Sequence, residues 1–132
     1  MNTRVLLVDA NDDSRAGLAE RLRRMRGLEL VGQACDAADA AQIIGRTEAD
    51  VVLIDLHGVD DAPADLCRAL RSLIPAPLAV LASFMTPPRW EQLQEAGATQ
   101  YLLKQVDTDG LRRALHELGV QYRARGRKEK TG

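Results

Sequence analysis

Two acids and one lysine are the residues whose types and spacing could carry chemistry in this chain. Asp9, Asp55 and Lys104 each stand at or near the end of a short apolar stretch. Acids that converge at one place repel each other and raise each other's pKa, so a cation is needed among them. Lys104 supplies one cation, and carboxylate oxygens with a backbone carbonyl suit Mg²⁺ as a second. A carboxylate held beside two cations can attack phosphorus, because both neutralise charge on the phosphoryl oxygens.

The elements that must position these residues follow from the apolar pattern. Five short aliphatic stretches predict buried strands, at residues 4–8, 28–34, 50–56, 78–82 and 100–103. Helical spacing predicts five helices, at residues 11–26, 36–46, 63–73, 88–96 and 107–123. Strands that alternate with helices predict an α/β fold, a doubly wound parallel sheet with helices on both faces. Ligands of such sheets bind at the carboxyl ends of the strands, where the two acids and the lysine are expected.

Residues at the helix ends refine the boundaries. Asp12 or Asp13 is expected to cap the first helix, and Asp36 the second, because short acidic side chains accept hydrogen bonds from free backbone N–H groups. Gly27 and Gly97 are expected to end the first and fourth helices.

Composition excludes several classes of protein. The chain has 132 residues, of which 45% are hydrophobic and 28% charged, as expected for one folded domain. Its apolar runs are far shorter than the roughly 20 residues of a membrane-spanning helix, and no secretory leader is expected. Cys35 and Cys67 stand far apart, which argues against a disulfide scaffold or a zinc finger and favours a cytoplasmic location.

Charge is distributed unevenly along the chain. The net charge is −1, but the last ten residues contain five basic residues and one acid. A folded domain is therefore expected at residues 1–122, followed by a basic, disordered tail at residues 123–132. The domain lacks the uniformly basic surface of a nucleic-acid-binding module, so no direct contact with nucleic acid is expected.

Over residues 3–122 the chain resembles the receiver domain of two-component response regulators, which has the flavodoxin-like fold of the chemotaxis regulator. The resemblance implies strand order 2-1-3-4-5. Asp55 matches the aspartate that accepts a phosphoryl group from a histidine kinase. Asp9 matches an acid that helps to bind Mg²⁺, and Lys104 matches the lysine that contacts the phosphoryl group.

Other positions match the same family. The residue two after the phosphoacceptor offers its backbone carbonyl to the metal, and here it is His57. Tyr101 matches an aromatic switch position, and residues 97–104 (GATQYLLK) resemble DNA-binding regulators of the nitrate-response type. The resemblance also implies a histidine kinase or phosphotransfer protein as partner. A homodimer or a downstream protein is expected to use the face of the fourth helix, fifth strand and fifth helix.

Two site positions depart from the family pattern. Ala10 replaces a second metal-binding acid, which predicts weak binding of Mg²⁺; Asn11, Asp12 and Asp13 are the neighbours that could reach the metal instead. Ala82 stands where the family has Thr or Ser, so weak coupling between phosphorylation and the switch is expected. Ser83 could replace that hydroxyl only if the strand ends before it, because neighbouring strand residues face opposite ways.

Three functions are compatible with this pattern. The first is a phosphorelay receiver, a signalling domain rather than an enzyme, with at most self-catalysed phosphotransfer and dephosphorylation at Asp55. The second is a pseudo-receiver, an interaction module that is not phosphorylated. The third is an unrelated flavodoxin-like binder; residues 55–57 (DLH) open a cobalamin-type motif, but Asp60 replaces its glycine and the motif is rejected.

Overall fold

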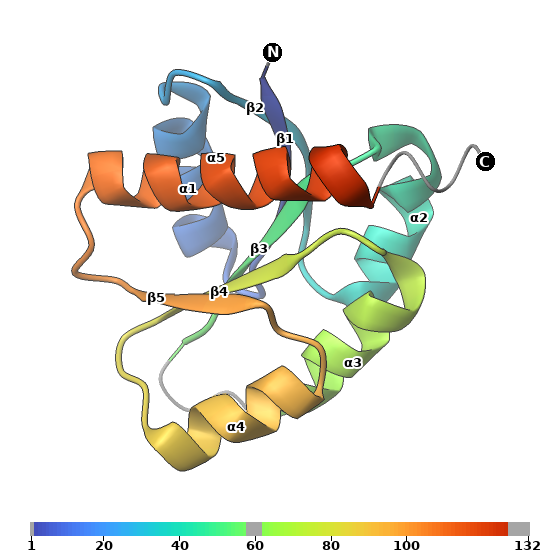
Figure 1. The fold of residues 1–132 in the computed structure, drawn as a ribbon, viewed down its shortest axis with the longest axis vertical. Helices are drawn as coiled ribbons and strands as arrows, with labels where there is room; N and C mark the ends of the chain where they lie inside the picture. Colours follow the sequence, from blue (N-terminus) through green and yellow to red (C-terminus); the bar gives the residue numbers. More distant parts are fainter. Residues whose placement is uncertain (1, 58–61, 127–132) are drawn as a thin grey trace.

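The structure, a computed structural model, describes residues 2–57 and 62–126. Its elements are β1 (Thr3–Val8), α1 (Asp12–Arg23), β2 (Leu28–Ala34), α2 (Ala37–Thr47), β3 (Val51–Asp55), α3 (Pro63–Leu73), β4 (Leu78–Ala82), α4 (Pro87–Glu95), β5 (Gln100–Leu103) and α5 (Thr108–Arg125). The five strands form one parallel sheet in the order β2-β1-β3-β4-β5. The expected doubly wound α/β fold and its strand order are confirmed (Figure 1).

The central strands contain continuous apolar runs because both faces of the sheet are covered. In β1, Val5 and Leu7 pack against α1 and α5, whereas Leu6 and Val8 pack on the opposite side with α2, α3 and α4. Side chains of successive strand residues point to opposite faces, so a strand buried on both sides reads as a continuous apolar run. In the part of the chain that is described, no helix is long and apolar enough to cross a membrane.

The start of α1 corrects one expectation. The N-cap is Asn11, not Asp12 or Asp13: its backbone is extended and its side-chain oxygen accepts the Ser14 N–H at 2.8 Å. Asp12 and Asp13 instead occupy the exposed first turn of the helix. Asparagine and aspartate are about equally good caps, so residue type gave no reason to prefer Asp12 or Asp13 over Asn11.

Two other predicted helix boundaries are confirmed and one is wrong. Asp36 caps α2 by accepting the Asp39 N–H, and Gly97 directly follows the C-cap of α4 with a φ angle of 112°. The first helix ends at Arg23, before Gly27, because the backbone N–H groups of Arg24 and Met25 bond carbonyls three residues back and turn the chain; Gly27 lies in that turn with a φ angle of 85°. These positive angles are in the region that glycine tolerates and other residues rarely adopt.

The last helix is longer than expected and continues into the segment assigned to the tail. It ends at Arg125, and Arg123 donates a hydrogen bond to Asp50 Oδ2 at 2.8 Å. The Asp50 side chain is completely buried and also accepts the Arg4 N–H at 2.9 Å. The folded part therefore reaches at least residue 125, past the expected boundary at 122. Residues 127–132 of the expected tail lie outside the described residues.

Replacing Arg123 tests whether this contact belongs to the domain. The change Arg123→Ala removes the cation that faces a buried carboxylate, which is expected to lower the free energy of unfolding by about 2 kcal/mol. Arg125→Ala, an exposed change on the same helix turn, should alter it by less than about 0.5 kcal/mol. Urea denaturation followed by circular dichroism measures both, and equal stabilities of the two variants would contradict the role given to Arg123.

Candidate functional site

Asp9, Asp55 and Lys104 meet at the carboxyl edge of the sheet, as their positions in the sequence predict. Asp9 follows β1, Asp55 ends β3 and Lys104 follows β5. The Lys104 ammonium Nζ lies 2.9 Å from Asp55 Oδ1. The Lys104 backbone N–H also bonds the Ala82 carbonyl, which continues the pairing of β4 with β5 and fixes where the lysine side chain starts.

Ser14 belongs to this site, although the sequence analysis did not single it out. Its hydroxyl Oγ donates a hydrogen bond to Asp55 Oδ2 at 2.9 Å. The residue lies in the first turn of α1, on the same face as the buried Leu18 and Leu22. Residues four apart share one face of a helix. The spacing 14, 18, 22 was therefore a signal that this hydroxyl faces the sheet edge.

His57 enters the site through its imidazole ring, whereas the family resemblance implies a role for its backbone carbonyl only. The ring Nε2 lies 2.7 Å from Asp9 Oδ1 and 3.8 Å from Asp55 Oδ2. Because an ionised carboxylate can only accept hydrogen bonds, Nε2 carries the hydrogen that bonds an ionised Asp9. The carbonyl role of His57 stays a prediction.

The acids of the site suit a bound cation. The Asp9 side chain is completely buried, and its Oδ2 has no hydrogen-bond partner among the described residues. A buried oxygen without a partner costs about 1–3 kcal/mol, and more when it is charged. Asp9, Asp55 and His57 each offer one ligand atom within 4.8 Å of the others. These residues therefore fit a divalent cation at the carboxyl edge of the sheet.

Burial affects the two carboxyl groups differently. Burial raises the pKa of Asp55; Lys104 opposes this rise, and the neighbouring Asp9 adds to it. Burial also favours the neutral form of Asp9, but the nearby Ser14 hydroxyl and the hydrogen bonds from the Asn11 backbone and His57 lower the pKa of Asp9 below its usual value. Asp9 is therefore the carboxylate that stays charged most readily, and a second negative charge on Asp55 is held at a cost.

The residues that follow Asp9 do not replace the missing second acid. Ala10 is exposed, and Asn11 contributes its backbone N–H to Asp9 Oδ1 at 2.9 Å. The Asp12 carboxylate pairs with Arg15 at 2.7 Å, on the outside of the helix. Within residues 2–57 and 62–126, the group of acids and histidines that could hold an ion is Asp9, Asp55 and His57.

The positions expected to form the switch lie at the end of β4 and on β5. β4 ends at the buried Ala82, so the condition for Ser83 to replace a hydroxyl there is met. Ser83 is nevertheless exposed, and the hydroxyl that bonds Asp55 in the described chain is that of Ser14. Tyr101 on β5 is 37% exposed, and its ring packs edge-on against Trp90 of α4, with ring centroids 5.0 Å apart.

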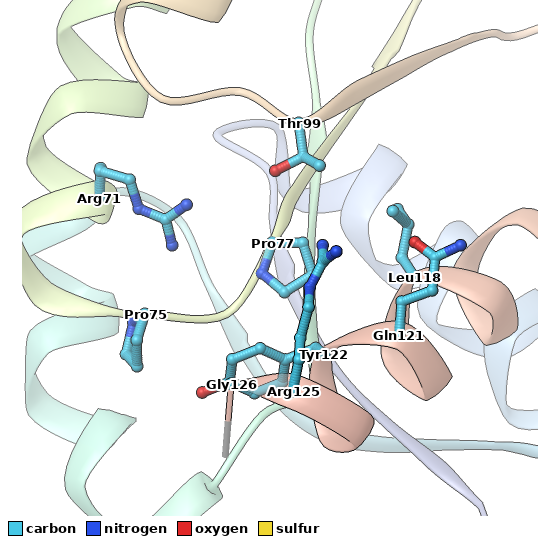
Figure 2. A pocket seen from close by; sticks show the side chains of 9 residues that line it. All are labelled: Arg71, Pro75, Pro77, Thr99, Leu118, Gln121, Tyr122, Arg125 and Gly126. Atoms are coloured by element: carbon cyan, nitrogen blue, oxygen red, sulfur yellow. The ribbon is translucent and has the colours of Figure 1, made fainter. Parts of the chain in front are cut away.

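A hollow of about 490 Å³ lies away from the acidic site, at the amino edge of the sheet (Figure 2). Pro75, Pro77 and Thr99, which precede β4 and β5, line it together with the end of α5. Figure 2 shows the Arg71 side chain reaching toward it, and that guanidinium bonds the carbonyls of Ile74 and Ala76. Its described lining contains no carboxylate, so the acidic site is the better candidate for phosphoryl chemistry.

Comparisons with known proteins agree with this geometry. LiaR of Bacillus subtilis, a transcriptional regulatory protein, is 35% identical over 105 residues, 76% of this chain and 48% of that protein. The nitrate/nitrite response regulator NarP of Escherichia coli is 32% identical, over 84% of this chain and 52% of its own length. The chain thus spans about half the length of these curated relatives.

A solved structure and a family sequence model also match this chain. The signal receiver domain of NarL from Mycobacterium tuberculosis superimposes with a TM-score of 0.75 and 25% identity, over 90% of this chain and 97% of that domain. The sequence model of the response regulator receiver domain matches residues 5–116. With the acids and the lysine brought together at the carboxyl edge of a 2-1-3-4-5 sheet, this chain belongs to the receiver domain family of two-component response regulators.

Proposed function

We propose that Asp55 is the phosphoacceptor, and that the donor is a phosphohistidine on a histidine kinase or phosphotransfer protein. A carboxylate oxygen of Asp55 attacks phosphorus, a P–O bond forms, and the P–N bond to the donor histidine breaks with its electron pair returning to the imidazole. The observation that carries this proposal is the contact between Asp55 and Lys104, at 2.9 Å, beside the buried Asp9.

The neighbouring side chains have separate tasks in this transfer. The Lys104 ammonium would bind the phosphoryl oxygens and neutralise charge that develops on them. Ser14 orients the Asp55 carboxylate through its hydrogen bond to Oδ2. Asp9 and Asp55, with the backbone carbonyl of His57, would hold Mg²⁺, which supplies charge neutralisation when bound. The receiver is a signalling domain rather than a classical enzyme, and self-catalysed phosphotransfer and dephosphorylation are the most that it would perform.

The output surface proposed here is formed by α4, β5 and α5. It exposes Tyr101 and Leu103 of β5, at 37% and 39%, beside the half-buried Trp90. Aromatic residues that are partly exposed are common anchors of protein interfaces. A second copy of the chain or a downstream protein would bind this face, and the setting would be the cytoplasm, where the kinase domains that phosphorylate such receivers act. We propose no contact between the described domain and nucleic acid or a membrane.

Phosphorylation of Asp55 is tested by intact mass after incubation with acetyl phosphate, in Mg²⁺ and separately in Mn²⁺. One phosphoryl adduct is expected, and Asp55→Asn should abolish it because the amide is not a nucleophile. Lys104→Ala should slow its formation at least roughly tenfold, because the ammonium no longer neutralises the phosphoryl oxygens. Absence of any adduct in both metals would contradict the proposal and favour the pseudo-receiver.

The raised pKa of Asp55 predicts that Asp55→Asn stabilises the fold in metal-free buffer. An acid whose pKa is raised by folding loses its contribution to stability as pH rises through that pKa. At pH 7 the variant should therefore be more stable by about 1 kcal/mol, and this gain should vanish as pH falls toward the ordinary value of 3.8. Thermal unfolding between roughly pH 3 and pH 7 measures it.

Glu20→Gln, an exposed change on α1, is the control for this measurement and should leave stability nearly unchanged across the same pH range. A variant Asp55→Asn that is less stable than the original chain at pH 7 would mean that the ion pair with Lys104 outweighs burial.

Weak coupling from Asp55 to the output face is predicted from Ala82, which cannot donate a hydrogen bond to a phosphoryl oxygen. Beryllofluoride, a phosphoryl mimic, should shift the amide NMR signals next to Asp55 but move those of Trp90 and Tyr101 little. The variant Ala82→Thr restores a hydroxyl and should enlarge the shifts at both aromatic residues. Large shifts there in the unchanged chain would show that coupling does not need this hydroxyl.

A further inference from the structure

The imidazole of His57 lies beside Asp9 and Asp55, and imidazole is not a ligand that Mg²⁺ prefers. Magnesium prefers carboxylate oxygens, phosphates and water in an octahedral arrangement. Imidazole nitrogen instead suits zinc, cobalt, nickel, copper and iron, and first-row divalent ions from manganese to copper bind mixed nitrogen and oxygen sites with increasing strength. The imidazole of His57 is directed at both acids, with Nε2 2.7 Å from Asp9 Oδ1 and 3.8 Å from Asp55 Oδ2.

These distances are close to those between ligands of one metal ion. Carboxylate oxygens and imidazole nitrogens bind zinc at about 2.0–2.2 Å, so two ligands of the same ion lie no more than about 4.4 Å apart. One atom from each of Asp9, Asp55 and His57 lies within 4.8 Å of the others. Small side-chain rotations therefore bring all three onto one ion, once the hydrogen of the His57 ring lies on Nδ1 and the lone pair of Nε2 is available to the metal.

A second observation points to a cation at this place. Asp9 Oδ2 is buried without a hydrogen-bond partner in the described chain, on a side chain that is completely buried. The other buried oxygen of the pair, Asp55 Oδ1, already faces Lys104 Nζ at 2.9 Å. The Asp9 oxygen is thus the acceptor that still lacks a positively charged partner, and it belongs to the same carboxylate that contacts His57.

We propose that the His57 imidazole is a direct metal ligand that takes the place of the acid missing at Ala10, and that it makes this site selective for a transition ion of the Zn²⁺ and Co²⁺ kind over Mg²⁺. The protein ligands are two carboxylates and one imidazole, which leaves further coordination positions for water or a phosphoryl oxygen. The inference rests on the proposed function only in placing the metal at the same acidic site; it does not require Asp55 to be phosphorylated.

The chain offers a built-in control, because it contains only two histidines. His116 lies on α5, where its Nδ1 is 3.1 Å from the hydroxyl of Thr3 at the start of β1, the opposite edge of the sheet. In a titration of the full chain with Zn²⁺, the ring NMR signals of His57 should shift and saturate while those of His116 stay in place. The same concentrations of Mg²⁺ should move neither ring. A Zn²⁺ titration that leaves the His57 ring signals unchanged overturns the proposal.

Variants then separate ligation by the ring from binding by the acids alone. His57→Ala and His57→Gln should each weaken Zn²⁺ binding at least tenfold in calorimetry and remove the visible absorption of bound Co²⁺, with Mg²⁺ affinity unchanged. His116→Ala should change none of these, and Asp9→Asn should weaken all three metals. Circular dichroism verifies that each variant is folded. Equal Zn²⁺ affinity of a folded His57→Gln and the original chain overturns the proposal.

The two proposals fail in different ways. Zn²⁺ binding that depends on His57, in a chain that acetyl phosphate does not modify, supports the metal site and contradicts phosphorylation of Asp55. A phosphoryl adduct formed equally well by the original chain and His57→Ala, with no Zn²⁺ binding by either, overturns the metal site and leaves Asp55 as the phosphoacceptor.

Discussion

The burial of Asp55 beside Asp9 is the constraint on which the rest of this structure depends. Both acids stand where central strands of a parallel sheet end, so the fold itself brings two negative charges together in a poorly solvated place. The surrounding groups each offset part of that cost: Lys104 just after β5, Ser14 from α1 and His57 from the loop after β3. Three separate parts of the chain thus contribute one polar group each, and the way they pack on the sheet edge sets the geometry of the site.

The two ends of β3 show how the same residue type acquires different roles. Asp50 stands just before the strand, completely buried, and receives a permanent cation from Arg123 and a backbone N–H from Arg4. Its hydrogen bonds tie α5 to the sheet. Asp55 ends the strand beside the Asp9 carboxylate, whose Oδ2 has no hydrogen-bond partner within residues 2–57 and 62–126. At the amino edge, the charge of Asp50 is therefore compensated by Arg123, and the contact holds α5 on the sheet. At the carboxyl edge, the two acids still favour an additional positive charge, which a metal ion can supply.

The strands, helices and charged positions at strand ends could be predicted because each depends on local pattern and chain connectivity. The strand order came from the family resemblance, since apolar runs do not reveal which strands are neighbours. The direction of the His57 ring and the contact of Ser14 with Asp55 depend on how α1 and the loop after β3 pack on the sheet edge. The Arg123–Asp50 pair joins residues 73 positions apart, so no local signal distinguished Arg123 from the basic residues that follow it.

Trp90 has a consequence for how this molecule can be observed. It is the single tryptophan of the chain, and it lies half-buried on α4 with its indole edge-on to the Tyr101 ring. Fluorescence excited selectively at tryptophan therefore originates at one corner of the molecule, at the margin of the aliphatic core. The Trp90 emission reports the local environment of α4 and β5. A partner that covers this corner shifts the emission wavelength of Trp90 even when the fold is unaltered.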